Sequence, residues 1–250
     1  AVISADSMQV YKHMDIGSAK IMPQEMDGVR HYLVDELEPF EEFHVVRFQE
    51  MACAAMKEIR SRGHIPILVG GTGFYIQAIL YDIAFTQTPS DPSYRLSLQR
   101  QADEQGVQAL YERLKEVDPV YAATLHANNV KRVIRALEYY HFTGEKFSVH
   151  NERESQRVSP YNFAYFVLTM NRQTLYNRID TRIDQMMDAG LYDEVASLLN
   201  KGLDPSLVSM QGLGYKELVP AIRGDISLDE AVCTLKRDTR HFAKRQLTWF

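Results

Sequence analysis

The chain has 250 residues, of which 45% are hydrophobic and 24% charged, as in typical folded globular proteins. This composition excludes a disordered or collagen-like chain, and no apolar run approaches the roughly 18–20 residues that a membrane span needs. The formal charge is −5, with −7 in residues 1–125 and +2 in residues 126–250, so a locally basic surface can exist on an acidic protein. The two cysteines form no disulfide framework, and no signal pattern opens the chain. We therefore expect a cytoplasmic protein.

The first half of the chain alternates predicted strands and helices. Residues 1–5 read as a buried strand, and an extended stretch follows near residues 31–35. Apolar residues at helical spacing predict a helix over 45–62 that Gly63 ends. The apolar run at 65–69 predicts another buried strand, followed by a glycine turn at 70–73 and a further helix. This order predicts an α/β fold with a parallel sheet.

The alternation stops near residues 86–92. Residues 93–143 show helical spacing without a convincing strand, which predicts an inserted helical lobe over 93–143. The α/β core then comprises residues 1–92 and 144–250. A strand of the same sheet is predicted at 162–170, and helices are predicted over 172–202 and 213–250.

Asp6 and Ser7 follow the first predicted strand, at the edge where open α/β sheets bind ligands. A carboxylate at this place can act as a general base or hold a metal ion. It can equally cap a turn or a helix.

Two turns have a composition that suits phosphate. Residues 15–20, with Lys12 just before them, combine a glycine, a hydroxyl and lysines, and such N–H and ammonium groups bind diphosphate. The alternative is a loop with solvated lysines. The glycine turn at 70–73 permits close approach of a ligand at a helix N-terminus, or is simply a tight connection.

Arg178 and Arg182 share one face of a predicted helix. They could complete a phosphate site, or they could pair with the neighbouring Asp180 or Asp184.

Basic residues also gather on helical faces in the second half of the chain. Such faces bind nucleic-acid phosphates, or are solvated surfaces with ion pairs. The turn at 211–216 holds a tyrosine and a lysine, which suit an unpaired base, or is an ordinary loop. The two basic faces comprise Lys131, Arg132 and Arg135, and Arg237, Arg240, His241, Lys244 and Arg245.

Several motifs occur in one order along nearly the whole chain. They are SADSMQVY at 4–11, MDIGSAK at 14–20, LVGGTGFY at 68–75, DP at 91–92 with Arg95, Arg132 with RALE at 135–138, GLGYK at 212–216 and AKRQLTW at 243–249. Each motif alone is weak, but the ordered series resembles the bacterial tRNA dimethylallyltransferases, also called tRNA isopentenyltransferases.

The resemblance implies a P-loop NTPase-like core whose helical insertion holds the anticodon stem-loop of tRNA. It implies transfer of a dimethylallyl group from dimethylallyl diphosphate to N6 of the adenosine 3′ of the anticodon, releasing diphosphate. Mg²⁺ is the implied cofactor, although the sequence fixes none of its ligands. We expect a monomer without membrane association. The alternatives are a small-molecule or nucleotide kinase, a transferase acting on free AMP, and a non-catalytic RNA-binding module.

The resemblance also implies roles for individual residues. Asp6 matches the general base, which accepts a proton from N6 during attack. The expected diphosphate contacts are Lys12, Gly17, Ser18, Ala19, Lys20, Arg178 and Arg182. The implied tRNA contacts are Asp6, Ser7, Met8, Gln9, Thr72, Arg95, Lys131, Arg132, Val133, Ile134, Arg135, Gln211, Gly212, Leu213, Gly214, Tyr215 and Lys216.

One element of the family pattern is absent from these 250 residues. The family begins with a strand and a Gly-Pro-Thr-Ala-Ser-Gly-Lys-Thr-like phosphate loop, upstream of the Asp-Ser motif. We therefore expect one more βα unit, about 30 residues, before Ala1.

Overall fold

The computed structural model describes residues 1–85 and 92–250, so Asp91 of the predicted Asp91-Pro92 motif lies outside the described residues. The chain divides into two compact units, which are treated separately. Unit 1 comprises Ala1–Leu80 and Tyr161–Phe250, and unit 2 comprises Tyr81–Pro160. Unit 2 includes the predicted insertion at 93–143 and extends beyond it at both ends.

A parallel sheet organises unit 1. Strand β1 (Val2–Ser4) lies between β2 (His31–Tyr32) and β3 (Ile67–Val69), and both pairings are parallel. The predicted α/β class with a parallel sheet is therefore confirmed. In the described part of the chain β3 pairs on one side only, and Ile67 and Val69 are 54% and 53% exposed. The expectation of a fully buried strand at 65–69 was wrong on this point.

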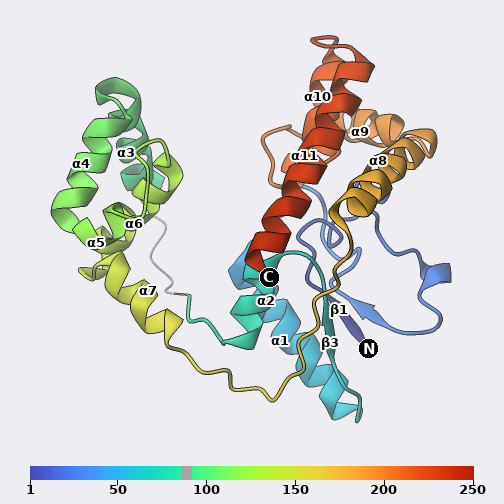
Figure 1. The fold of residues 1–250 in the computed structure, drawn as a ribbon, viewed down its shortest axis with the longest axis horizontal. Coiled ribbons are helices and arrows are strands. Elements are labelled where there is room, and N and C mark those ends of the chain that lie inside the picture. The colour runs from blue at the N-terminus through green and yellow to red at the C-terminus, as the bar shows by residue number, and fades with distance from the viewer. Residues whose placement is uncertain (86–91) are drawn as a thin grey trace. The chain divides into compact units, whose positions relative to one another are not determined.

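Helices make up most of the rest of unit 1, as Figure 1 shows. Helix α1 follows the predicted spacing, because Phe48, Ala52, Ala55 and Ile59 form its buried face. Gly190, with a φ of 99°, ends one predicted helical stretch and begins the next, which divides 172–202 into two helices. The α-helices of unit 1 are α1 (Val45–Ser61), α2 (Gly73–Leu80), α8 (Arg172–Asp188), α9 (Leu191–Asn200), α10 (Tyr215–Arg223) and α11 (Leu228–Trp249), with short 3₁₀ turns at Pro23–Glu25 and Ser209–Gln211.

Aromatic rings fill the core of unit 1 between the sheet and α1. Phe48 stacks on Tyr75 with ring centroids 4.5 Å apart, and Phe43 meets both rings edge-on. Tyr11 completes the cluster against Phe43. Since Phe48 belongs to α1 and Tyr75 to α2, these ring contacts join the two helices that follow β2 and β3, in the same core as Ile3 of β1.

The strand predicted at 162–170 was wrong. No strand is assigned between residues 161 and 171 of the described chain. This segment has the alternating apolar and aromatic residues of a strand, but none of the described strands pairs with it. Phe166 and Leu168 are largely exposed. A strand exists only with a hydrogen-bonded neighbour, which local sequence cannot supply.

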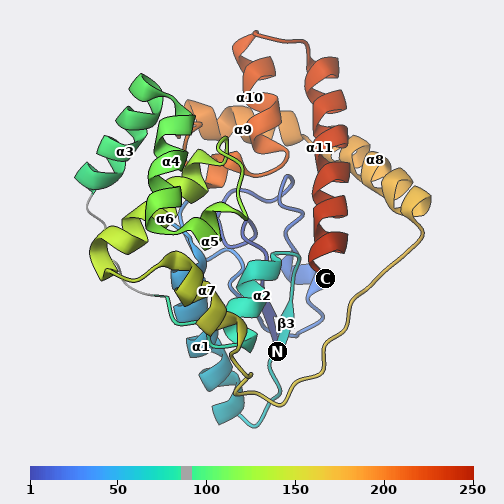
Figure 2. The same ribbon diagram turned by 60° about the vertical axis from the view of Figure 1, so that its left-hand side comes forward.

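Unit 2 is a helical bundle with its own core. Leu98, Leu110, Leu114, Val133 and Leu137 are buried where α3, α4 and α6 pack together (Figure 2). No described helix of either unit is long and apolar enough to cross a membrane. The helices of unit 2 are α3 (Pro92–Gln105), α4 (Val107–Val117), α5 (Pro119–Ala122), α6 (Val130–Thr143) and α7 (Phe147–Ser155).

Candidate functional site

The carboxyl ends of β1 and β3 form one edge of the sheet in unit 1. The Ala5 N–H donates to the Val69 carbonyl at 2.7 Å, and the Thr72 N–H donates to the Ala5 carbonyl at 3.2 Å. A Cβ added at Gly70 would overlap the backbone of Ala5. The glycine turn therefore rests directly on the end of β1, which brings Thr72 and the residue after Ala5, Asp6, to the same edge.

The end of α11 closes against this glycine turn. The Gln246 side-chain amide donates to the Gly71 carbonyl at 2.9 Å. A Cβ at Gly73 would overlap the indole ring of Trp249. Figure 1 shows the C-terminal end of α11 beside α2. Gln246 and Trp249 of the AKRQLTW motif thus pack against the glycine turn at the site, a contact that the sequence analysis did not predict.

Asp6 serves the turn after β1 with one of its two carboxylate oxygens. Oδ1 accepts hydrogen bonds from the backbone N–H of Met8 at 2.7 Å and of Gln9 at 3.3 Å. Oδ2 has no hydrogen-bond partner among the described residues. The turn-forming role that the sequence left open is therefore real, and it leaves one oxygen for chemistry.

Burial is the main influence on Asp6 and raises the pKa of its carboxyl group above the usual 3.8. The N–H groups of Met8 and Gln9 and the positive charge of Arg182 act against this rise. Burial, with smaller contributions from the charges of Tyr11 and Asp6, raises the pKa of Tyr75 to about 12. A carboxylate with a raised pKa binds a proton more tightly, as a general base should.

Arg178 and Arg182 are exposed on α8, and the positive charge of Arg182 acts on Asp6. The alternative that they pair with neighbouring acids was wrong, because Asp180 binds Arg240 and Asp184 binds Lys236, each at 2.5 Å. Arg182 has no ion pair within the described chain. Among the described residues, the guanidinium of Arg178 has one hydrogen-bond contact, with the sulfur of Met170 at 4.0 Å. These two arginines therefore provide cationic groups for an anion.

Unlike these two arginines, the polar groups of the loop at 15–20 already have hydrogen-bond partners within the protein. Lys20 is 7% exposed, and its ammonium group donates to the Tyr11 carbonyl at 2.6 Å, to Asp15 at 2.5 Å and to Asp35 at 2.8 Å. The N–H groups of residues 15–17 donate to Glu194. The geometry favours a structural role for Gly17, Ser18, Ala19 and Lys20 over the predicted diphosphate contact. Lys12 pairs with Glu38 at 3.0 Å.

The turn at 211–216 is also structural at its centre. Tyr215 is fully buried, and its hydroxyl donates to Glu194 Oε1 at 2.7 Å. A ring in this position cannot stack on a base, so the prediction of a stacking tyrosine was wrong. Gly212 and Gly214 are buried as well, whereas Gln211 and Lys216 are exposed and Leu213 is half-buried.

The remaining predicted contacts in unit 1 lie near Asp6. Ser7, Met8 and Thr72 are half-buried at the sheet edge. The side chain of Gln9 is engaged, since its amide donates to the Ala19 carbonyl at 3.2 Å and its oxygen accepts from the Ser4 hydroxyl at 3.1 Å.

The predicted contacts in unit 2 divide between surface and core. Lys131, Arg132 and Arg135 are exposed on α6, whereas Val133 and Ile134 are buried, so the side chains of the last two cannot contact RNA as predicted. Lys131 and Arg132 line a cavity of about 520 Å³. Arg95 forms a bidentate ion pair with the buried Glu138, with N–O distances of 2.9 and 2.6 Å.

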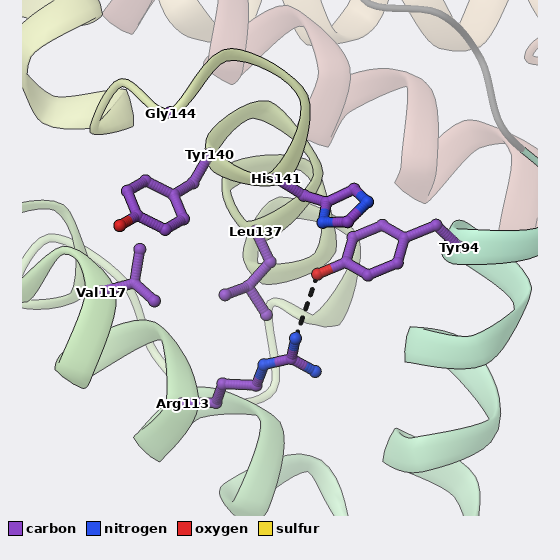
Figure 3. A pocket seen from close by; sticks show the side chains of 7 residues that line it. All are labelled: Tyr94, Arg113, Val117, Leu137, Tyr140, His141 and Gly144. Carbon is purple, nitrogen blue, oxygen red and sulfur yellow. Dashed lines mark hydrogen bonds between the residues drawn. The ribbon is translucent and has the colours of Figure 1, made fainter.

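A second cavity in unit 2, of about 350 Å³, opens between α3, α4 and α6 (Figure 3). The ring of Tyr94 stacks on His141 there, with centroids 3.9 Å apart. Arg113 points into the cavity, but it donates to the Tyr94 hydroxyl at 3.1 Å and to Gln101 at 3.1 Å. Its guanidinium group thus joins α4 to α3.

Sequence reasoning missed Glu194. It lies in the first turn of α9, where an acidic side chain usually favours the helix dipole. Nothing in its sequence neighbourhood indicates a loop more than 170 residues away.

Comparison with known proteins gives one consistent result. The family model described as IPP transferase matches residues 9–250. A tRNA dimethylallyltransferase of Lachnoclostridium phytofermentans is 59% identical, and one of Acetivibrio thermocellus is 50% identical; each alignment covers 100% of this chain and 80% of the relative.

Solved structures agree with this result. The tRNA isopentenylpyrophosphate transferase of Bacillus halodurans has a TM-score of 0.71 and 46% identity, over 100% of this chain and 77% of that one. A eukaryotic dimethylallyltransferase acting on tRNA has a TM-score of 0.84 and 30% identity, over 99% of this chain and 62% of that one.

Proposed function

Because the chain belongs to the IPP transferase family, we propose that it transfers a dimethylallyl group from dimethylallyl diphosphate to N6 of the adenosine 3′ of the anticodon in tRNA. The observation that carries this proposal is the arrangement of Asp6. One of its oxygens is fixed by two backbone N–H groups, and the other has no partner among the described residues. Burial raises the pKa of the same carboxyl group.

The reaction forms a bond between N6 and the allylic carbon and breaks the bond between that carbon and the diphosphate oxygen. The N6 amino group becomes acidic only as the new bond forms, and Oδ2 of Asp6 accepts its proton. Diphosphate leaves with the electron pair of the broken bond. Arg182, whose charge acts on Asp6, and Arg178, one turn earlier on α8, are the cationic groups that we assign to the departing charge.

Mg²⁺ stays a prediction. Among residues 1–85 and 92–250 there is no group of three or more His, Cys, Asp or Glu side chains that could hold a metal ion. The described residues therefore do not form a protein-held metal site. Mg²⁺ commonly keeps water and substrate phosphates as ligands, so a bound ion would depend on the diphosphate itself.

Unit 2 supplies the proposed contact with the anticodon stem-loop. Lys131, Arg132 and Arg135 are exposed along one side of α6, and phosphates attract such a row of cations. Arg95 supports this helix through its ion pair with Glu138. A tRNA substrate also favours the predicted cytoplasmic location, and the proposed enzyme acts as a monomer.

The test is a transfer assay with the full-length protein, Mg²⁺ and labelled dimethylallyl diphosphate. An anticodon stem-loop with consecutive adenosines is compared with free AMP. We expect label in the stem-loop only. Label in AMP alone would replace the tRNA substrate by a free nucleotide, and no label in either would refute prenyl transfer.

The variant Asp6→Asn tests the proton acceptor. Asparagine keeps an oxygen for the Met8 and Gln9 N–H groups but is not a base, so transfer should fall by about 100-fold or more. Affinity for the stem-loop, measured by titration, should change little. The matched control is Asp204→Asn, since Asp204 also accepts a backbone N–H two residues on, from Ser206 at 2.7 Å. Equal activity of the two variants would contradict the role of Asp6.

A further inference from the structure

We propose that Glu194 is a positioning residue for Asp6, and that it acts through the loop at 15–20 and the side chain of Gln9. The inference rests on the proposed function, because the group that Glu194 positions is the proposed proton acceptor. Every contact in the connection lies within unit 1.

The carboxylate of Glu194 accepts four hydrogen bonds. Oε2 accepts from the N–H groups of Asp15 at 2.9 Å and Ile16 at 2.8 Å. Oε1 accepts from the Gly17 N–H at 3.1 Å and from the Tyr215 hydroxyl at 2.7 Å. Three consecutive N–H groups of the loop thus converge on one side chain, as they would on a bound anion. Glu194 takes the place that a ligand would need, and it fixes the loop.

Close packing fixes the same loop from a second side. A Cβ at Gly17 would lie 2.6 Å from the ring of Tyr215, so only glycine admits this contact. The position of the loop is therefore set jointly by α9, which carries Glu194, and by α10, which carries Tyr215.

Gln9 connects the loop to Asp6. Its side-chain amide donates to the Ala19 carbonyl at 3.2 Å and lies 3.5 Å from the Ser18 carbonyl. Its backbone N–H donates to Asp6 Oδ1 at 3.3 Å. Its side-chain oxygen accepts from the Ser4 hydroxyl at 3.1 Å. One residue therefore binds the loop at one end and the proposed proton acceptor at the other.

The Ser4 hydroxyl completes the connection. It donates to Gln9 and accepts from the Asp6 N–H at 3.4 Å. The backbone of Asp6 and one of its carboxylate oxygens are thus both tied to Gln9. A displacement of the loop moves Gln9, and that displacement reaches the carboxylate. Misplacing a catalytic group by about 1 Å can reduce a rate by about 100-fold.

The test compares Glu194→Gln with Glu230→Gln in the full-length protein. An amide at position 194 must turn its NH₂ group toward at least one N–H donor of residues 15–17. At least one of the three backbone hydrogen bonds to the side chain at position 194 is then lost. Glu230 is the matched control, because it also accepts a backbone N–H, from Ser227 at 2.9 Å, but at the start of α11. Single-turnover transfer is measured at saturating dimethylallyl diphosphate and stem-loop. We expect a loss of about 10- to 100-fold for Glu194→Gln and none for Glu230→Gln.

Two further measurements separate positioning from simple loss of folding. Stem-loop affinity should be unchanged in Glu194→Gln, so the defect lies in kcat and not in KM. Amide hydrogen exchange should accelerate at Met8 and Gln9 as well as at residues 15–17, because the effect passes along the connection. Tyr215→Phe, which keeps the ring against Gly17 and removes only the hydroxyl, should give the same pattern with a smaller loss.

The outcomes are distinguishable from failure of the proposed function. An inactive wild-type protein would refute prenyl transfer itself. An active wild-type protein with normal single-turnover rates in Glu194→Gln would overturn the positioning role alone. Faster exchange at residues 15–17 with unchanged exchange at Met8 and Gln9 would likewise overturn it, since Glu194 would then hold only its own loop.

Discussion

At the scale of single residues, Asp6 shows how one carboxylate can serve both a turn and a reaction. Burial disfavours its charged form, while two N–H groups and Arg182 favour it. Burial is the larger influence, so the pKa of Asp6 lies above its ordinary value. A fully solvated aspartate at the same turn would hold the backbone equally well but would bind a proton less tightly. Burial of Asp6 thus makes its carboxylate more basic and, at pH values where the group is charged, makes the folded protein less stable.

The raised pKa of Asp6 predicts that the stability difference between wild type and Asp6→Asn depends on pH. Because the pKa of Asp6 is higher in the folded protein, its stabilising contribution is complete below the unfolded pKa and is lost as pH rises through the folded pKa. Asparagine does not titrate. The Tm of the variant relative to wild type should therefore rise between about pH 4 and about pH 7.5, in thermal melts at both ends of this range.

Asp204→Asn provides the opposite sign as a control. The Ser206 N–H and hydroxyl lower the pKa of Asp204, so its carboxylate stabilises the protein above the unfolded pKa and stops doing so as pH falls. This variant should lose Tm at neutral pH and recover relative to wild type in acid. If both variants responded alike to pH, the different environments of the two carboxylates would not be the cause.

At the scale of elements, the loop at 15–20 behaves as a packed structural element. The Lys20 ammonium group bridges the Tyr11 carbonyl and two carboxylates that retain contact with water. Its neighbours therefore hold the charge inside the protein by three direct hydrogen bonds. The same residues that suit a diphosphate in sequence are here bonded to one another.

Lys20→Met should consequently act on stability. Methionine preserves the apolar stem but removes the three bonds, and we expect the free energy of unfolding in urea to fall by about 2 kcal/mol, the scale for hydrogen bonds to charged groups. KM for dimethylallyl diphosphate should stay near the wild-type value. A raised KM with unchanged stability would instead assign Lys20 to the diphosphate. Lys12→Met is the comparison, because the Lys12–Glu38 pair is partly exposed and should contribute less.

Elements were predictable from sequence where local spacing decides them. Helix α1 begins and ends close to the predicted limits, because Phe48, Ala52 and Ile59 repeat at helical spacing and a glycine follows the last turn. Contacts between distant segments were not predictable. Glu194 meets residues 15–17 only through the tertiary fold, and the same contact buries the Tyr215 ring that sequence alone placed at an RNA surface.

At the scale of the whole molecule, the chain has two separate hydrophobic cores. One core gathers the aromatic cluster and the helices of unit 1, and the other is formed by residues of α3, α4, α5 and α6. No described residue belongs to both cores. A unit with its own core can unfold while the other unit stays folded. Proposed chemistry and proposed RNA binding are thus stabilised by different sets of contacts.

Leu114→Ala tests this division. Leu114 is fully buried in the core of unit 2, so its truncation should cost about 3 kcal/mol there. Native-state hydrogen exchange in rising urea should show α4 and α6 losing protection, while α1 keeps its wild-type protection. Val120→Ala is the control within unit 2, because Val120 is 68% exposed and should cost less than about 0.5 kcal/mol. Equal loss of protection in α1 would mean that both cores unfold as one, and a core substitution in unit 2 would then also lower the stability of the site around Asp6.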